Sequence, residues 1–156
     1  MSDSPHVAIA GATGAVGEEM LKCLEQRNFP VGEISLLASA RSVGRKILFR
    51  GRECLVQELG HDSFKGVDIA LFSAGGALSL EYGPSAAKAG AVVIDNSSAF
   101  RMDPEVPLVV PEVNPAAAQN RPKGIIANPN CTTIITMMGL NPLHRKFGLR
   151  SIIASS

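Results

Sequence analysis

The chain carries a series of short apolar runs separated by polar stretches. Most of the runs are nearly continuous rather than alternating, which is typical of strands covered on both faces of a parallel sheet. The runs that we predict as strands are residues 6–10, 34–38, 67–72, 91–94, 108–110, 124–127 and 151–154.

Helical spacing of apolar positions separates several of these runs. We predict helices within residues 16–25, 78–88 and 132–146, and a glycine, Gly90 or Gly148, follows each of the last two. Strands that alternate with helices predict an α/β fold of the Rossmann-like, doubly wound kind, with a mostly parallel sheet.

Two segments depart from this alternation. Residues 46–58 hold two short apolar patches around Arg50-Gly51-Arg52, a pattern that favours a hairpin over a helix. Four prolines between residues 104 and 115 predict a loop-rich passage over the carboxyl ends of the strands.

Composition narrows the function classes. With 156 residues, 46% of them hydrophobic and 19% charged, the chain is long and apolar enough for one domain with a real core. A net charge of +1 and an aromatic content of 4% argue against a nucleic-acid partner. The chain has no apolar run of membrane-spanning length, and residues 1–5 lack the basic and apolar regions of a signal peptide. The three cysteines are widely spaced. We therefore expect a cytoplasmic protein with no membrane partner.

A glycine-rich segment, Gly11-Ala12-Thr13-Gly14-Ala15-Val16-Gly17, follows the first predicted strand and opens the first predicted helix. Its glycines allow a tight turn and a close approach of a pyrophosphate to the helix N-terminus, so we predict a dinucleotide site. The alternative is a glycine-rich turn that only packs the helix on the sheet.

The next predicted strand indicates which nicotinamide cofactor is bound. NAD sites place an acidic residue about 20 residues after the glycines, but Leu37 and Ala38 stand there. Ser39, Arg41 and Ser42 follow instead, and hydroxyls with an arginine suit the 2′-phosphate of NADP. The alternative is that Arg41 is a solvated loop residue.

Two further segments end predicted strands. Ser73, Ala74 and Gly75 place small residues at the sheet edge, as a second wall of the cofactor site or as an ordinary strand–helix turn. The loop 95–101 offers several hydrogen-bonding groups and Arg101, which would suit an anionic substrate or belong to a capped, exposed turn.

Cys131 is the candidate nucleophile. It stands between a short strand and a predicted helix, where the free N–H groups and the positive end of the helix dipole stabilise a thiolate. Cys23 and Cys54 lack such a position, and none of the three histidines has a spacing that pairs it with Cys131. We see no metal-site spacing. If the thiol needs a general base, we expect that base outside this chain.

The chain resembles aspartate-β-semialdehyde dehydrogenase over nearly its whole length. The motifs that carry the resemblance are Gly11–Gly17, Leu37–Ser42, Asp68–Gly75, Asp95-Asn96-Ser97, Phe100-Arg101, Val109–Asn114 and Asn128-Pro129-Asn130-Cys131. The last two are fairly specific, and the related N-acetyl-glutamyl-phosphate reductases share the plan without these motifs.

The resemblance implies an NADPH-dependent reductive dephosphorylation of L-aspartyl-4-phosphate to the semialdehyde, with release of phosphate, on the route to lysine, methionine and threonine. It implies that Cys131 carries a thioester, that Asn130 positions the acyl group and that Arg101 binds the departing phosphate. The cofactor residues that it implies are Gly11, Thr13, Gly14, Ala15, Val16, Ser39, Arg41, Ser42, Ser73, Ala74 and Gly75.

The length departs from the family pattern. The family continues past residues 152–155 into a second domain with the catalytic histidine, a glutamine, the arginine for the substrate carboxylate and most of the interface of a homodimer or homotetramer. We therefore expect an NADP-binding domain at residues 1–130, and the nucleophile helix and first strand of a truncated catalytic domain at 131–156, with little or no turnover. The alternatives are an N-acetyl-glutamyl-phosphate reductase and a nucleotide-binding fragment without catalysis.

Overall fold

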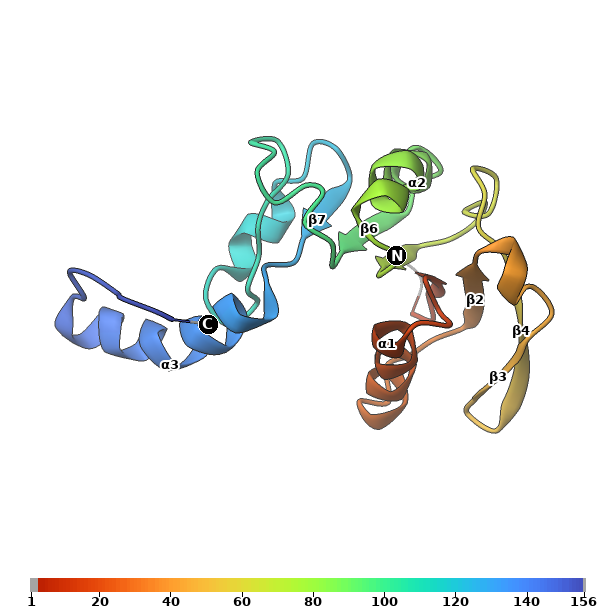
Figure 1. The fold of residues 1–156 in the computed structure, drawn as a ribbon, viewed down its shortest axis with the longest axis horizontal. Helices are drawn as coiled ribbons and strands as arrows, with labels where there is room; N and C mark the ends of the chain where they lie inside the picture. The colour runs from red at the N-terminus through yellow and green to blue at the C-terminus, as the bar shows by residue number, and fades with distance from the viewer. Residues whose placement is uncertain (1–2, 156) are drawn as a thin grey trace.

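The computed structural model describes residues 3–155 and contains one seven-stranded sheet with helices around it (Figure 1). The strands are β1 (His6–Ala10), β2 (Glu33–Ala38), β3 (Lys46–Phe49), β4 (Arg52–Glu58), β5 (Ile69–Phe72), β6 (Val92–Asp95) and β7 (Ile125–Ala127). The helices are α1 (Ala15–Gln26), α2 (Gly76–Lys88) and α3 (Cys131–Phe147), with two short 3-10 turns, η1 (Ala40–Ser42) and η2 (Pro115–Gln119).

The sheet has the order β3-β4-β2-β1-β5-β6-β7, and only the β3–β4 pair is antiparallel. From β1 the chain moves outward to β2 and β4, and then returns to the other side of β1 as β5. This reversal creates a switch point between β1 and β5, where open α/β sheets bind their ligands. The predicted Rossmann-like, mostly parallel fold is confirmed, as is the predicted hairpin, which is β3 and β4.

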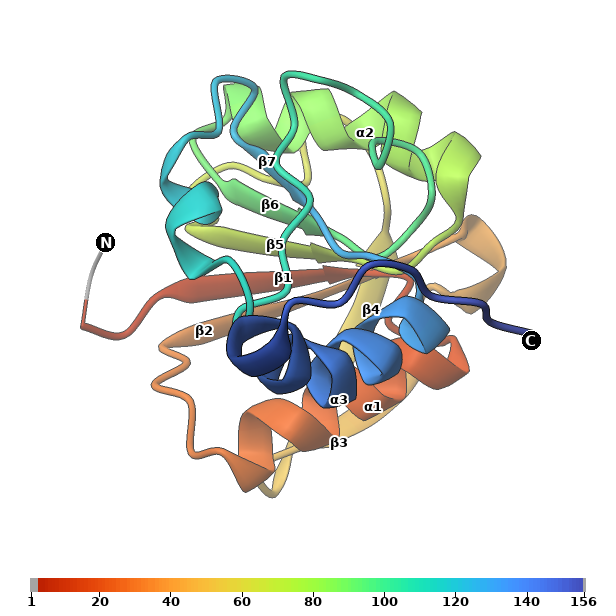
Figure 2. The ribbon, with the colours of Figure 1, turned by 90° about the vertical axis from the view of Figure 1, so that its left-hand side faces the viewer.

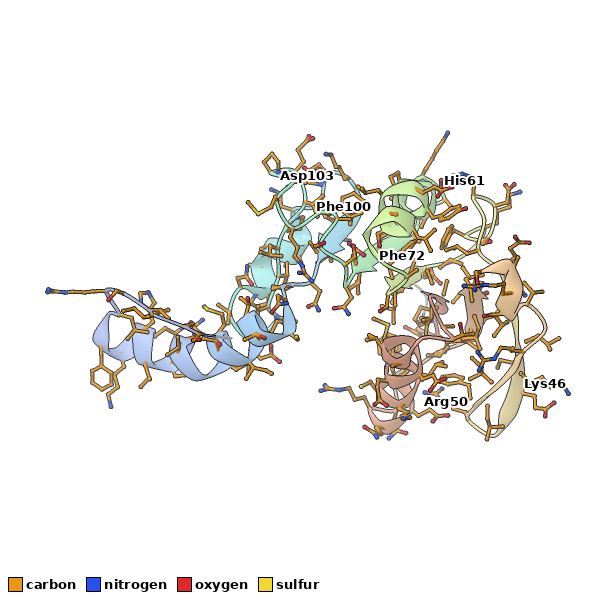
Figure 3. All side chains as sticks on the ribbon, viewed as in Figure 1. Lys46, Arg50, His61, Phe72, Phe100 and Asp103 are labelled. Atoms are coloured by element: carbon orange, nitrogen blue, oxygen red, sulfur yellow. The ribbon has the colours of Figure 1, made fainter. Side chains whose placement is uncertain are left out.

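Helices α1 and α2 cover opposite faces of the sheet (Figure 1). On the α1 side, Leu21 packs with Ile9 and Leu36. On the α2 side, the rings of Phe64 and Phe72 stack with centroids 5.6 Å apart. Phe72 and Phe100, which belong to the same layer, are labelled in Figure 3. Burying each such side chain contributes about 1.5–3 kcal/mol, so these two layers hold the loops between strands and helices in place.

The predicted strand at residues 108–110 does not form. Leu108 makes one isolated bridge to Ala127, and the amide of Val109 donates to the carbonyl oxygen of Ala127 at 3.0 Å. Pro107 and Pro111 stand on either side and have no amide hydrogen, so the ladder cannot extend beyond this bridge.

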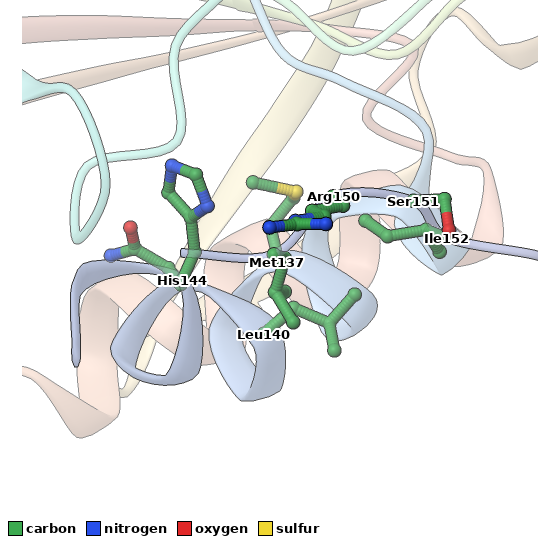
Figure 4. Close-up of a pocket in the computed structure, with 8 residues that line it drawn as sticks. Met137, Leu140, His144, Arg150, Ser151 and Ile152 are labelled. Atoms are coloured by element: carbon green, nitrogen blue, oxygen red, sulfur yellow. The ribbon is translucent and has the colours of Figure 1, made fainter. Parts of the chain in front are cut away.

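The predicted strand at residues 151–154 does not form either. Residues 151–155 have no regular structure and are exposed, because no neighbouring strand offers them hydrogen bonds. After Gly148, which has a left-handed φ of +68°, the chain folds back along α3. A groove of about 370 Å³ lies between them, lined by Met137, Leu140, Ile152 and their neighbours (Figure 4).

Helix α3 extends away from the sheet (Figure 1). None of its residues is buried, and Arg145 donates one long hydrogen bond, 3.3 Å, to the carbonyl oxygen of Val113. Ile135 and Phe147 leave 74% and 69% of their surface exposed. Within residues 3–155, no helix has the length and apolar character needed to cross a membrane.

Candidate active site at the carboxyl edge of the sheet

Five loops leave the carboxyl ends of parallel strands at one edge of the sheet. They begin with Gly11 after β1, Ser39 after β2, Ser73 after β5, Asn96 after β6 and Asn128 after β7. The three helices also begin at this edge (Figure 2). The topology therefore gathers all the predicted site segments on one side of the molecule.

Two glycines of the first loop are required by close backbone contacts. Gly11 has φ +89°, and a Cβ at this position would lie 2.4 Å from the carbonyl oxygen of Ser73. A Cβ on Gly17 would lie 2.3 Å from the carbonyl oxygen of Gly11. These contacts press the start of α1 against β1 and against the loop after β5, which agrees with the packing alternative for these two positions.

Gly14 is different, because an added Cβ would make only an ordinary contact of 3.4 Å with the carbonyl oxygen of Gly11. Gly14 is the N-cap of α1, and Glu18 is the first residue of the helix to donate to it, at 3.0 Å. The amides of Ala15, Val16 and Gly17 therefore have no acceptor within α1. Unpaired amides at a helix N-terminus fit the pyrophosphate of a dinucleotide.

The loop after β2 lies against the glycine loop. Thr13 Oγ1 donates to Ser42 Oγ at 3.4 Å, and Ser42 belongs to the short turn η1 that Ser39 caps. The Arg41 side chain is exposed and makes no hydrogen bond or ion pair within residues 3–155. No acidic side chain occurs between β2 and Glu53. An unpaired arginine and two hydroxyls beside the glycine loop fit a 2′-phosphate.

The loop after β5 is the other wall of the switch point. The amide of Ser73 donates to the carbonyl oxygen of Ala10 at 2.8 Å, and Ala74 is half-buried next to it. Gly75 has φ +92° and is the N-cap of α2. Ser73, Ala74 and Gly75 therefore stand opposite Gly11 at the predicted cofactor site.

Arg101 joins the loops after β6 and β7. Its Nε donates to the carbonyl oxygen of Asn128 at 2.9 Å, and its Nη2 donates to the carbonyl oxygen of Asn96 at 3.1 Å. These two bonds use two of the five guanidinium N–H groups and leave three for an anion. Arg101 is half-buried, so it is not the exposed turn residue of the alternative interpretation. It also keeps N–H groups that no backbone oxygen occupies.

Three residues of these loops had no predicted role of their own. Asn128 Nδ2 donates to Asn96 Oδ1 at 2.7 Å, and this bond ties the two loops together. Asp95 is fully buried at the end of β6 and accepts hydrogen bonds from Ser79 and Ser97. Their position directly at or after the carboxyl ends of strands, where open α/β sheets bind ligands, was the sequence signal that could have found them.

Cys131 is the first residue of α3, one residue earlier than predicted, and its side chain is exposed. Asn130 is the N-cap, and its Oδ1 accepts a hydrogen bond of 2.9 Å from the amide of Thr132. That bond occupies the amide oxygen of Asn130 and leaves its Nδ2 for the predicted contact with an acyl group. The thiol thus stands at the positive end of a 17-residue helix.

No histidine within residues 3–155 is placed to assist Cys131. The His6 ring lies 2.8 Å from Ser35 Oγ, and the His61 ring lies 2.8 Å from Ser85 Oγ. His144 is 13 residues further along α3, which at 1.5 Å per residue corresponds to about 20 Å from Cys131.

A groove of about 390 Å³ runs along α1 and reaches the loop after β6. It is lined by Val16, Met20, Cys23, Leu71, Asn96 and four further residues. The start of α1 and the loop that holds Arg101 therefore open onto one groove, whose other walls are mostly apolar.

Comparison with known proteins agrees with this geometry. Residues 6–121 match the family described as semialdehyde dehydrogenase, NAD-binding domain. An aspartate-semialdehyde dehydrogenase of Aquifex aeolicus is 57% identical over 153 residues, which are 97% of this chain and 45% of that protein. The chain thus spans slightly less than half of this relative, and the predicted resemblance is confirmed.

Solved structures give the same result. Aspartate-semialdehyde dehydrogenase II of Vibrio cholerae, complexed with ASA, matches with a TM-score of 0.88 and 53% identity, over 93% of this chain and 48% of that one. Aspartate-semialdehyde dehydrogenase of Candida albicans, with NADP, matches with a TM-score of 0.76 and 28% identity, over 94% of this chain and 48% of that one. The chain belongs to the semialdehyde dehydrogenase family, whose NAD-binding domain its residues 6–121 form.

Proposed function

We propose that this chain is the NADP-binding and nucleophile-bearing part of an aspartate-semialdehyde dehydrogenase. In the complete protein it would act on L-aspartyl-4-phosphate and release L-aspartate-4-semialdehyde and phosphate. The observation that carries the proposal is the groove along α1. It is lined by Val16, in the predicted pyrophosphate loop, and by Asn96. The side chain of Asn96 accepts a hydrogen bond from Asn128, which lies three residues before Cys131.

The residues present fit the cofactor. The open position at Gly14 and the unpaired amides of Ala15 and Val16 would hold the pyrophosphate. Ser39, Arg41 and Ser42 would hold the 2′-phosphate, and the Candida albicans relative with NADP supports this preference. NADPH, when bound, supplies the hydride that reduces a thioester to an aldehyde.

Cys131 would form the thioester. Its thiolate attacks the acyl carbon, the C–S bond forms, and the C–O bond to the phosphate breaks, so the phosphate leaves with the electron pair. After the reduction the C–S bond breaks and returns the sulfur as a thiolate. The dipole of α3 stabilises the anionic sulfur before the attack and after the release.

Arg101 would receive the departing phosphate. Two of its N–H groups hold the backbone of Asn96 and Asn128, which fixes the guanidinium beside the loop of Cys131. Its three remaining N–H groups can bind the phosphate with charge-assisted hydrogen bonds. Asn130 Nδ2 would bind the acyl oxygen.

The proposed division of the chain places the NADP-binding domain at residues 1–130 and the nucleophile segment at 131–156. The general base, the site for the substrate carboxylate and the contacts of a homodimer or homotetramer would belong to the other part of the complete protein. We therefore expect little or no turnover from these 156 residues alone.

Alkylation with iodoacetamide at neutral pH tests the primed thiol. Cys23 and Cys131 are both exposed, so Cys23 is an internal control for access. We expect Cys131 to be labelled at least about tenfold faster, because the reactive species is the thiolate. NADP should protect Cys131 and leave Cys54, which does not line the groove, unchanged. Equal labelling of the two cysteines would contradict the proposal.

The complete enzyme separates the proposed reaction from its alternatives. Oxidation of NADPH with release of phosphate from aspartyl phosphate, but not from N-acetyl-glutamyl phosphate, supports the proposed substrate. Cys131→Ser should abolish that turnover and keep the affinity for NADP. A protein that binds NADP and reduces neither substrate would instead be a nucleotide-binding module.

A further inference from the structure

Asp95 is a fully buried carboxylate at the end of β6, and no cation pairs with it within residues 3–155. Its Oδ1 accepts from Ser79 Oγ at 2.7 Å and from the amide of Ser97 at 3.1 Å. Its Oδ2 accepts from Ser97 Oγ at 2.6 Å. A buried carboxyl group without partners is costly, and here three hydrogen bonds from neutral groups satisfy its oxygens. The arrangement fixes the position of Ser97.

Ser97, held by Asp95, also fixes the loop that follows it. Its Oγ also accepts from the amide of Ala99 at 3.1 Å, so the turn from Asp95 to Ala99 is held from within. Arg101 follows two residues after Ala99, and its Nη2 donates to the carbonyl oxygen of Asn96 in the same turn. The direction of the Arg101 side chain therefore depends on the turn that Asp95 organises.

The same turn also reaches the loop of the candidate nucleophile. The carbonyl oxygen of Asp95 accepts from the amide of Asn128 at 2.8 Å, and Asn96 Oδ1 accepts from Asn128 Nδ2. In the other direction, Ser79 lies in the first turn of α2, and its amide donates to the carbonyl oxygen of Gly75 at 3.0 Å. One buried carboxylate thus stands between the cofactor wall and the Arg101 loop.

We propose that Asp95, through Ser97, is a positioning residue that holds the Arg101 guanidinium in the geometry that binds an anion beside Cys131. This inference rests on the proposed function, because it assigns a task to the residue that shapes the anion site. Asp95 itself touches no reacting atom. Its removal should weaken anion binding and leave the exposed thiol of Cys131 as accessible as before.

The test measures how inorganic phosphate slows the alkylation of Cys131 by iodoacetamide, a neutral reagent, at constant ionic strength. In the wild-type chain we expect phosphate to protect Cys131 and not Cys23. Asp95→Asn and Ser97→Ala should raise the half-protecting phosphate concentration about tenfold, as expected for losing a hydrogen bond to a charged group. Alkylation without phosphate should stay within about twofold, because neither change touches the sulfur.

Ser97→Thr, which keeps the hydroxyl, should restore protection, and Ser98→Ala should behave as the wild type, because Ser98 is exposed and makes no side-chain hydrogen bond within residues 3–155. Wild-type protection in Asp95→Asn and Ser97→Ala, with or without a lower Tm, would overturn the positioning role and leave the proposed function intact. A wild-type chain that phosphate does not protect would remove both the role of Arg101 and this inference. Ser97→Ala keeps the test decisive if Asp95→Asn fails to fold.

Discussion

At the scale of single residues, the glycine loop combines two different requirements. Gly11 and Gly17 are fixed by backbone atoms that would lie 2.4 Å and 2.3 Å from an added Cβ. Gly14 meets no such obstacle and caps α1 where a phosphate would approach. The sequence pattern predicted the loop, but it could not assign the packing role to two glycines and the ligand role to the third.

Alanine substitutions separate these two roles. Gly11→Ala should destabilise the chain by about 2–5 kcal/mol, because it combines a positive φ with a clash against rigid backbone. Gly14→Ala should cost about 0.5–1 kcal/mol and weaken NADP binding. Chemical denaturation and a fluorescence titration with NADPH measure the two effects. A stable Gly11→Ala chain would show that the loop can relax.

Arg41→Glu tests the proposed reading of the 2′-phosphate. Replacing an arginine by an acid at a phosphate should weaken NADP binding by at least about tenfold and leave NAD binding nearly unchanged. Arg52→Glu makes the same charge change at the exposed start of β4, the edge of the sheet away from the carboxyl ends, and is the matched control. Isothermal titration with both cofactors gives the answer, and equal losses for NADP and NAD would exclude this role for Arg41.

At the scale of elements, the helices and strands with strong hydrophobic periodicity were predicted correctly. The wrong predictions are apolar runs whose structure depends on pairing with another strand. The buried parallel strands, the hairpin and the start of α3 were predictable from apolar runs and glycines. Residues 108–110 and 151–154 are also apolar, but a strand needs hydrogen-bonding partners. Flanking prolines limit residues 108–110 to one bridge, and residues 151–154 have no neighbouring strand.

The candidate site was predictable to a similar extent. Residues that follow a strand, such as Arg101 and Cys131, could be predicted because parallel strands end at one edge. The role of Asn128 depends on its hydrogen bond to Asn96, 32 residues away, and the role of Asp95 on its hydrogen bond from Ser79 in α2, 16 residues away. No local pattern encodes such bonds. Hydrogen bonds between distant segments therefore could not be predicted from the sequence.

The long connection between β6 and β7 is closed by an ion pair. Lys123 Nζ lies 2.6 Å from Asp103 Oδ2, and this pair joins the start of the connection to its end. The hydrogen bond from Lys123 lowers the pKa of Asp103 below its ordinary value, and the amide of Glu105 adds to the effect. Because the folded pKa is lowered, the stabilisation is present at neutral pH and is lost as the pH falls through that pKa.

Asp103→Asn should therefore lower the Tm by roughly 1–3 °C at pH 7, and the difference should vanish toward pH 2–3. Asp62→Asn removes a charge from a more exposed pair within one turn, Asp62 with Lys65, and should change the Tm less. Thermal melts between pH 2 and 7 measure both variants. A difference that persists at low pH would assign the effect to packing rather than to the ion pair.

At the scale of the whole molecule, the sheet is a packed body and α3 is an appendage to it. The sheet has a core on both faces, whereas no residue of α3 is buried. The helix also has a weak intrinsic propensity, since Thr132 to Thr136 are β-branched and Gly139 and Pro142 follow. A helix of this kind depends on packing for its stability, so its apolar side chains fit a surface that another part of the complete protein would cover.

Removing α3 tests this division directly. A chain that ends at Asn130 should keep its Tm within about 2 °C, because the deleted residues bury no core and the two apolar layers remain complete.

In the full 156-residue chain, amide hydrogens of α3 should exchange orders of magnitude faster than those of β1 and β5, because opening α3 costs far less than opening the sheet. Arg145→Ala, which removes the hydrogen bond from α3 to the carbonyl oxygen of Val113, is the control for the contribution of that bond. A fall of more than about 5 °C on truncation would mean that α3 packs on the sheet in solution, and the proposed boundary at residue 130 would then be wrong.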